Sequence, residues 1–335
     1  MNESSEILFK HGNEQKKIVL FDVSVGSMNL GDYIIMESIY QQIRSILNSG
    51  YILNMPTHLT PFNFIQIQRD FRANWVKKSD LKFICGTDLI TSSMFHTINQ
   101  LNVHLWTCSP LCNSVLLGVG NSWHKEKSNL YTKLIYNKIF SREFLHSVRD
   151  RETQVTLKSF GFDSIVTGCP TLWGITPELC RDIPKEKSDS VVFTLTGSNP
   201  DEQKDYEMIQ ILKKNYKKVY FWIQTAWDYE YFRTIPDTKD IKIILPDLSA
   251  YGEFLSNYDV DYVGTRLHGG IYAIQHKKRA VIIAIDSRSR DMAKVNNFNL
   301  LERDSVGELN KIINGNFETN IYVDFDAVDK WKNQF

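Results

Sequence analysis

The stretch Gly264-Thr265-Arg266-Leu267-His268-Gly269-Gly270 joins two runs of different periodicity. The apolar pair Tyr262-Val263 before it indicates the end of a strand, and Ile271-Tyr272-Ala273-Ile274 after it has helical spacing. The first N–H groups of a helix have no intrahelical acceptor and carry partial positive charge. With Arg266 beside them, this junction predicts a site for an anionic group, phosphate or carboxylate.

A second junction follows closely. Residues 279–285 read as a strand, and they end in Asp286-Ser287-Arg288-Ser289-Arg290. This places two more arginines in a polar loop at a strand end. We therefore expect both junctions to form one anion-binding, catalytic edge.

The N-terminal part of the chain opens in a comparable way. Residues 17–23 predict a buried strand, residues 24–32 a glycine-containing loop, and residues 32–47 a helix with isoleucines at helical spacing. The loop is neither a Walker motif, because Asp32 stands where a lysine is needed, nor G-x-G-x-x-G. It still offers backbone N–H groups and one carboxylate at the carboxyl end of a strand.

The alternation of strands and helices continues along the chain. Further strands are predicted at 82–85, 115–119 and 164–167, with helices at 130–145 and 153–160. A polar segment at 175–189 with two prolines reads as a linker. A second alternation then begins, with strands at 190–195, 219–223, 241–245, 261–263 and 279–285.

These patterns predict an α/β fold with two Rossmann-like domains facing across a cleft, the GT-B-like arrangement. The N-terminal domain is expected at 1–178 and the C-terminal domain, which carries the Arg-Leu-His-Gly stretch, at 190–310. The tail at 311–335 is a candidate to pack back on the N-terminal domain.

Composition limits the classes of function. The chain has 335 residues with 39 basic and 39 acidic side chains, which argues against a general nucleic-acid binder. The polar start lacks the features of a signal peptide, and the apolar runs have strand length, so a cytoplasmic location is expected. Five cysteines in no zinc-binding spacing indicate buried thiols rather than a metal site.

The ordered motifs resemble the polysaccharide pyruvyl transferase family. Asn29-Leu30-Gly31-Asp32 is similar to its N-terminal motif, and Val148-Arg149-Asp150-Arg151-Glu152 to its Arg-Asp segment. Residues 264–269, followed by a helix, a strand and Asp286-Ser287-Arg288, match its C-terminal half. The chain departs from the family at Gly86-Thr87-Asp88, at Cys169 and at Arg288, where a lysine is common.

The resemblance implies a GT-B-like fold and transfer of pyruvate from phosphoenolpyruvate onto a sugar of a surface polysaccharide, usually as a ketal. The donor needs several cations, so Arg266, Arg288 and Arg290 are candidate donor-binding residues together with Gly269. His268 is the candidate general acid or base, and Asp32 the candidate group that orients or deprotonates a hydroxyl. Asn29, Gly31 and Trp227 are candidate acceptor-binding residues. This chemistry requires no metal and no cofactor beyond the donor substrate.

Structural explanations remain open for each residue. His268 could be a helix-start residue bonded to a carbonyl, Arg266 could pair with an interdomain acid, and Asp32 could be an acid favoured by a helix dipole. Arg149 and Asp150 are expected to lock a strand to its helix rather than to bind ligand. Trp227 could pack between domains instead of stacking on a sugar.

Two other functions also remain open. One is a GT-B glycosyltransferase that uses a nucleotide sugar, with Asp286 or Asp291 gripping the ribose. The other is a non-catalytic sugar-binding module on the same fold. A lipid-linked acceptor would bring the protein to the inner face of a membrane with at most peripheral contact, and the oligomeric state stays open.

Overall fold

The computed structural model describes residues 15–95, 100–121 and 129–335. Contacts within the chain divide it into two compact units. The N-terminal unit comprises the described residues up to Ser27, Ile35–Trp173 and Asp324–Phe335. The C-terminal unit comprises Met28–Ile34 and Gly174–Val323.

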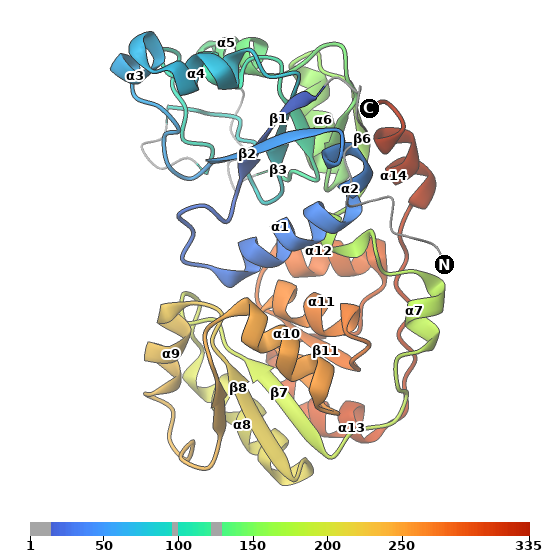
Figure 1. The fold of residues 1–335 in the computed structure, drawn as a ribbon. Helices are drawn as coiled ribbons and strands as arrows, with labels where there is room; N and C mark the ends of the chain where they lie inside the picture. The colour runs from blue at the N-terminus through green and yellow to red at the C-terminus, as the bar shows by residue number, and fades with distance from the viewer. Residues whose placement is uncertain (1–14, 96–99, 122–128) are drawn as a thin grey trace. The chain divides into compact units, whose positions relative to one another are not determined.

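The sheet of the N-terminal unit is parallel, in the order β2-β1-β3-β4 (Figure 1). A parallel pair, β5 and β6, continues it through a bridge between Val119 and Val148. The strands are β1 (Lys16–Asp22), β2 (Gly50–Pro56), β3 (Leu81–Cys85), β4 (Val115–Leu117), β5 (His146–Val148) and β6 (Ser164–Val166). The central strands have buried apolar stretches, residues 18–21 in β1 and 83–85 in β3, as expected for parallel strands covered on both faces.

Helices surround this sheet: α1 (Leu30–Gln42), α2 (Arg44–Leu47), α3 (Phe64–Arg69), α4 (Phe71–Lys77), α5 (Leu130–Ile139), α6 (Arg151–Ser159) and α14 (Phe325–Lys332), with 3₁₀ turns η1 (Ser109–Leu111) and η2 (Pro170–Leu172). The last helix, α14, is part of this core. Its Trp331 is fully buried, with ring centroids 5.9 Å from Phe83 and 5.8 Å from Trp173.

The sheet of the C-terminal unit is also parallel, in the order β12-β11-β10-β7-β8-β9. The chain starts at the centre with β7 (Ser190–Thr194) and steps outward to β8 (Lys218–Trp222) and β9 (Lys242–Ile244). It then returns to the other side of β7 for β10 (Asp261–Gly264), β11 (Ala280–Ala284) and β12 (Leu300–Glu302). This is the doubly wound order of Rossmann folds, and its switch point lies between β7 and β10.

Helices connect these strands: α7 (Pro177–Arg181), α8 (Glu202–Asn215), α9 (Ala226–Phe232), α10 (Leu248–Asn257), α11 (Leu267–Gln275), α12 (Ser287–Asn296), η3 (Arg303–Glu308) and α13 (Leu309–Asn314). Val191 and Phe193 of β7 pack with Leu212 of α8 and Leu309 of α13 in one apolar cluster. Because side chains alternate along a strand, Val192 and Thr194 point to the opposite face.

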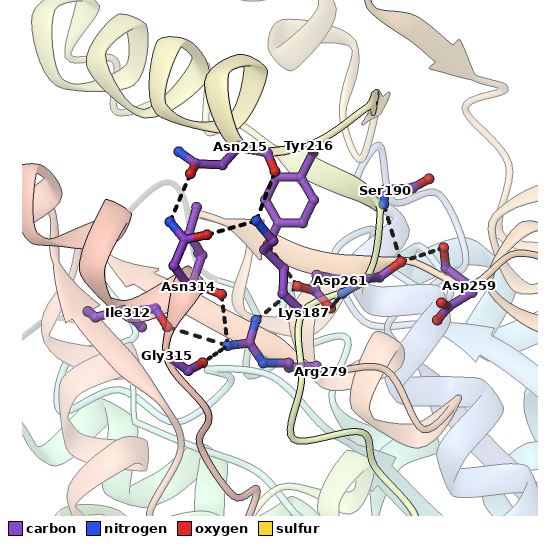
Figure 2. A network of polar contacts seen from close by, with 12 residues as sticks. Lys187, Ser190, Asn215, Tyr216, Asp259, Asp261, Arg279, Ile312, Asn314 and Gly315 are labelled. Carbon is purple, nitrogen blue, oxygen red and sulfur yellow. Dashed lines mark hydrogen bonds and ion pairs between the residues drawn. The ribbon is translucent and has the colours of Figure 1, made fainter.

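A buried ion pair ties together the amino ends of β10 and β11. Arg279 donates to Asp261 at 2.9 Å, and it also donates to the carbonyls of Ile313 and Gly315 at 3.1 and 2.6 Å (Figure 2). Tyr216 donates to the same Asp261 carboxylate at 2.7 Å. Arg279 thus satisfies carbonyls at the end of α13, at the edge of the sheet opposite to the carboxyl ends of its strands.

The predicted α/β fold with two Rossmann-like parts is confirmed. The structure adds β2, α3, α4 and β12, for which the sequence pattern gave no assignment, and α7 lies within the predicted linker. Of the predicted tail, α13 belongs to the C-terminal unit and α14 to the N-terminal unit. None of the helices in the described part of the chain is both long and apolar enough to cross a membrane.

Candidate active site

The carboxyl ends of β7 and β10 meet at the switch point of the C-terminal sheet, where open α/β sheets bind their ligands. Gly264 pairs with Thr194 there. A Cβ on Gly264 would collide with the hydroxyl and the backbone of Thr194, so this close approach requires glycine. Just beyond the strands, the hydroxyls of Thr196 and Thr265 join the two loops with a 2.8 Å hydrogen bond.

A buried phenol fixes the start of α11 at this point. Tyr262 donates to the carbonyl of Arg266 at 2.7 Å, and its oxygen lies 2.6 Å from the Thr194 hydroxyl. The Arg266 N–H donates to that hydroxyl at 3.2 Å. Burial raises the pKa of Tyr262, which keeps the phenol protonated as a donor. The turn that carries Arg266 is therefore held from two sides.

The guanidinium of Arg266 forms an ion pair with Asp228 of α9. Its Nε donates to Asp228 Oδ2 at 3.0 Å and to the carbonyl of Leu195 at 3.1 Å. Its Nη2 donates to Asp228 Oδ1 and, at 3.0 Å, to the hydroxyl of Thr225. Asp228 is fully buried, while 13% of the Arg266 side chain remains exposed. The acid that pairs with Arg266 is thus not an interdomain residue, as one alternative expected, but Asp228 of the same unit.

Each carboxylate oxygen of Asp228 also accepts a backbone N–H. Asp228 accepts the N–H of Gly197 at 2.9 Å and that of Thr225 at 3.0 Å, in addition to Arg266. A Cβ on Gly197 would collide with the Trp227 carbonyl, so this contact also needs glycine. Within the described residues, no group accepts a hydrogen bond from Nη1 of Arg266. One edge of the guanidinium is anchored, and Nη1 can serve an anion.

The Asn29–Asp32 motif and the Gly264–Gly270 motif both pack against Gln224, which follows β8. Its Nε2 donates to Asn29 Oδ1 at 2.8 Å, and its carbonyl accepts the Leu30 N–H at 3.0 Å. A Cβ on Gly31 would lie 2.9 Å from Gln224 Nε2, and one on Gly269 would lie 3.2 Å from Gln224 Oε1. Glycines of both motifs therefore pack on one buried amide.

Asn29 closes a tight turn at the start of α1. Its side chain accepts the Gly31 N–H at 3.0 Å, and its carbonyl accepts the Asp32 N–H at 3.0 Å. Asp32 is buried in the first turn of α1. The sequence analysis assigned this motif to the N-terminal domain, whereas its contacts with Gln224 and Thr225 place it in the C-terminal unit.

His268 and Gly269 occupy the first turn of α11, and both are buried. The Gly269 carbonyl accepts the hydroxyl of Tyr251 at 3.2 Å. Tyr251 in turn stacks on Trp222 at 3.9 Å between ring centroids. An aromatic layer thus supports the turn that carries the histidine.

Arg288 and Arg290 lie in the first turn of α12, not in the loop that the sequence predicted. Asp286 begins this helix by accepting the Ser289 N–H at 2.8 Å, a standard N-cap contact. Nη2 of Arg288 lies 3.4 Å from Asp286. Arg290 donates to both oxygens of Glu302, with its Nε 2.9 Å from each, and this contact raises the Arg290 pKa. Arg290 is thus already paired.

Trp227 stands on α9, and 46% of its surface is exposed. In the N-terminal unit, Arg149 pairs with Asp88, and Asp150 caps α6 by accepting the Thr153 N–H at 2.7 Å. Asp150 thus joins the end of β5 to α6 as expected, whereas the main partner of Arg149 is Asp88, in the loop after β3, rather than a residue of that helix.

Sequence reasoning missed Gln224 and Asp228. A local signal existed for the second, because Thr225 and Asp228 have the spacing of a capping box and follow a strand, and the structure forms that box. No local signal marks Gln224, because its partner Asn29 is far away in the sequence.

Comparisons with known proteins agree with this picture. The model of the polysaccharide pyruvyl transferase family matches residues 29–287. No curated protein matches the sequence significantly.

Among solved structures, the S. aureus MnaA–UDP co-structure is similar at 12% identity and a TM-score of 0.50, covering 95% of this chain and 94% of that chain. A putative UDP-N-acetylglucosamine 2-epimerase from Listeria monocytogenes is similar at 11% identity and a TM-score of 0.51, covering 95% of both chains. At this identity the likeness concerns the fold, and it agrees with the predicted GT-B-like class.

Proposed function

The chain belongs to the polysaccharide pyruvyl transferase family, and on that premise we propose that it moves pyruvate from phosphoenolpyruvate onto sugar hydroxyls as a ketal. The acceptor is a surface polysaccharide or its lipid-linked precursor. The observation that carries the donor assignment is Arg266, whose guanidinium is anchored by Asp228 while Nη1 stays available at the N-terminus of α11.

The donor's chemistry explains why such an arginine is needed. Phosphoenolpyruvate carries a phosphate and a carboxylate close together, so its site must supply several positive groups. The guanidinium of Arg266 and the backbone N–H groups in the first turn of α11 supply the first of these positive groups. Arg288 follows β11, the strand next to β10, and supplies a second cation. Arg290 contributes less, because Glu302 already occupies its guanidinium.

The proposed transfer forms two C–O bonds between the pyruvyl carbon and the sugar. A proton adds to the terminal carbon of the enol, and a sugar hydroxyl attacks the resulting oxocarbenium-like carbon and loses its proton. A second hydroxyl then forms the other ketal bond, and phosphate leaves with that hydroxyl's proton. His268 supplies the first proton, and Asp32 accepts one from the attacking hydroxyl.

The acceptor is proposed to lie by Asn29, Gly31 and Trp227. The half-exposed indole of Trp227 provides an apolar face on which a sugar ring can stack. Asn29 and Gly31 define the turn that places Asp32.

The test is turnover with labelled phosphoenolpyruvate and a panel of free and lipid-linked glycans, followed by mass spectrometry and phosphate release. We expect one phosphate released for each pyruvyl group attached. His268→Ala and His268→Gln should lower turnover by roughly 10²–10⁴-fold, the usual contribution of a general acid. Turnover at the wild-type rate in both variants would remove His268 from the chemistry.

Ligand stabilisation gives a separate check on the donor. Phosphoenolpyruvate should raise the melting temperature of the wild-type protein, because a ligand that binds only the folded state stabilises it. Stabilisation by a UDP-sugar and not by phosphoenolpyruvate would replace the proposal with the nucleotide-sugar alternative.

A further inference from the structure

The helices α3 and α4 are neighbours in the N-terminal unit (Figure 1). Together with the loop before them they carry several exposed apolar side chains. We name this surface the α3–α4 patch. Its apolar members are exposed to 54% (Leu59), 55% (Phe64), 66% (Ile65) and 80% (Phe71). Single exposed apolar residues are ordinary, but four large ones within a short segment mark an interaction surface.

The patch is held in place although α3 buries none of its own residues. Asn63 and Gln66 form a reciprocal capping box at the start of α3, with bonds of 2.8 and 2.9 Å. Asp70 caps α4 by accepting the Arg72 N–H at 2.9 Å. Phe62 before α3 and Val76 in α4 are buried and anchor the segment. The side chains are therefore presented on formed helices.

The patch also carries positive charge in a chain with no net charge. Its cations are Arg69, Arg72, Lys77 and Lys78, and the one acid between Leu59 and Lys78 is Asp70, which pairs with Arg72. The Arg72 guanidinium lies 6.0 Å from the centroid of the Phe71 ring. An aromatic ring and a guanidinium thus lie side by side at the start of α4, in a segment rich in basic residues.

From this combination we propose that the α3–α4 patch docks the protein on the surface of an anionic lipid bilayer. Aromatic and aliphatic side chains enter the boundary between headgroups and acyl chains, while arginine and lysine contact the lipid phosphates. The charge favours this occupant over a second copy of the chain, because two such patches would repel each other. The inference does not depend on the identity of the donor.

The test is co-sedimentation of the full chain with vesicles. We expect binding to vesicles of phosphatidylcholine and phosphatidylglycerol in equal parts, weaker binding to phosphatidylcholine alone, and weakening by salt. The double variant Phe64→Ser/Phe71→Ser should lower the partition coefficient between vesicles and water at least about tenfold, because two rings that insert into the bilayer are lost. Arg69→Gln with Lys78→Gln should lower binding to anionic vesicles only.

Val155→Ser is the matched control, because Val155 is 60% exposed on α6 of the same unit. It should bind vesicles as the wild type does. Equal vesicle binding by the wild type and the Phe64→Ser/Phe71→Ser variant, or no vesicle binding by the wild type, would overturn the proposal. Loss of dimers in that variant, measured by light scattering without any vesicle binding, would assign the patch to a second copy and overturn it too. Pyruvyl transfer to a free glycan is measured separately, so failure of the proposed function stays distinguishable.

Discussion

The side-chain amide of Gln224 donates a 2.8 Å hydrogen bond to Asn29 Oδ1 across 195 positions of sequence. The Gln224 carbonyl also accepts the Leu30 N–H, so the start of α1 is tied to the end of β8 by side chain and backbone. Gly269 packs against the same amide. Gln224 thus links the turn that carries Asp32 to the turn that carries His268.

Replacing Gln224 with methionine should loosen this junction. The variant removes one of the two N–H donors of Asn29 Oδ1 and leaves the Gly31 N–H, which is expected to lower the free energy of unfolding by about 0.5–1.5 kcal/mol. Turnover should fall further than stability explains, because Asp32 loses its support. The measurement is a double-mutant cycle of Gln224→Met and Asn29→Ala, with denaturation and steady-state kinetics. Fully additive effects on both quantities would contradict the coupling.

The buried pair of Arg279 and Asp261 predicts a different outcome. Arg279→Leu leaves the Asp261 carboxylate buried without its cation, and it removes a guanidinium donor from three carbonyls near α13. We expect a loss of about 3–5 kcal/mol in the free energy of unfolding. Combining it with Asp261→Asn should recover part of that loss.

Because this pair lies at the amino ends of β10 and β11, folded Arg279→Leu protein should keep its Michaelis constant for the donor. A changed donor constant at full folding would show that Arg279 also acts on the site. Equal unfolding energies for the single variant and the wild type would contradict the structural role.

His146 predicts how stability depends on pH. Its ring is fully buried, Nδ1 accepts the Leu116 N–H at 3.1 Å, and Nε2 lies 2.9 Å from the Ser141 carbonyl. Burial lowers the His146 pKa from 6.5 to about 4, so the folded protein holds a neutral ring with the proton on Nε2. Between these two values the unfolded chain binds a proton that the folded protein does not.

The free energy of unfolding should therefore fall as the pH drops from 6.5 to about 4. Below pH 4, His146 should cause no further decrease. The total contribution is on the order of 3 kcal/mol. The comparison is with His146→Asn, which can accept from Leu116 and does not titrate. Urea denaturation across this range should give the wild type the steeper decline, and parallel curves would contradict the assignment.

Local pattern predicted most of the strands and the glycine-bearing turns, because periodicity and turn residues are found in neighbouring positions. It did not predict β2, β12 or the helix α7 inside the expected linker. It could not predict that Asp228 pairs with Arg266 or that Gln224 contacts Asn29. Contacts between distant segments leave no periodicity in the local sequence. Local pattern also placed Arg288 and Arg290 in a loop, because Ser-Arg-Ser-Arg has no apolar period. The Asp286 cap begins α12 nonetheless. In α3 no residue is buried, and its apolar residues Phe64 and Ile65 are exposed, so their spacing does not mark a buried helix face.

Arg266→Lys is the sharpest test of the donor site. Lysine carries the same charge, but it cannot hold both Asp228 oxygens and still present a second edge to an anion. Nε of Arg266 now binds Asp228 Oδ2 at 3.0 Å and the Leu195 carbonyl at 3.1 Å, and both contacts would be lost. We expect the Michaelis constant for phosphoenolpyruvate to rise at least about tenfold, together with a loss of about 1–3 kcal/mol of stability.

Arg290→Lys is the matched control for Arg266→Lys. Arg290 also makes a two-oxygen contact, in this case with Glu302, but it is more exposed and already paired. It should change the donor constant less than about threefold, because an exposed ion pair contributes only roughly 0–1 kcal/mol. The two variants are compared by donor titration in saturating acceptor and by urea denaturation. If Arg266→Lys lost stability but kept the wild-type donor constant, the pair with Asp228 would be structural alone, and the anion would have to bind elsewhere on the sheet edge.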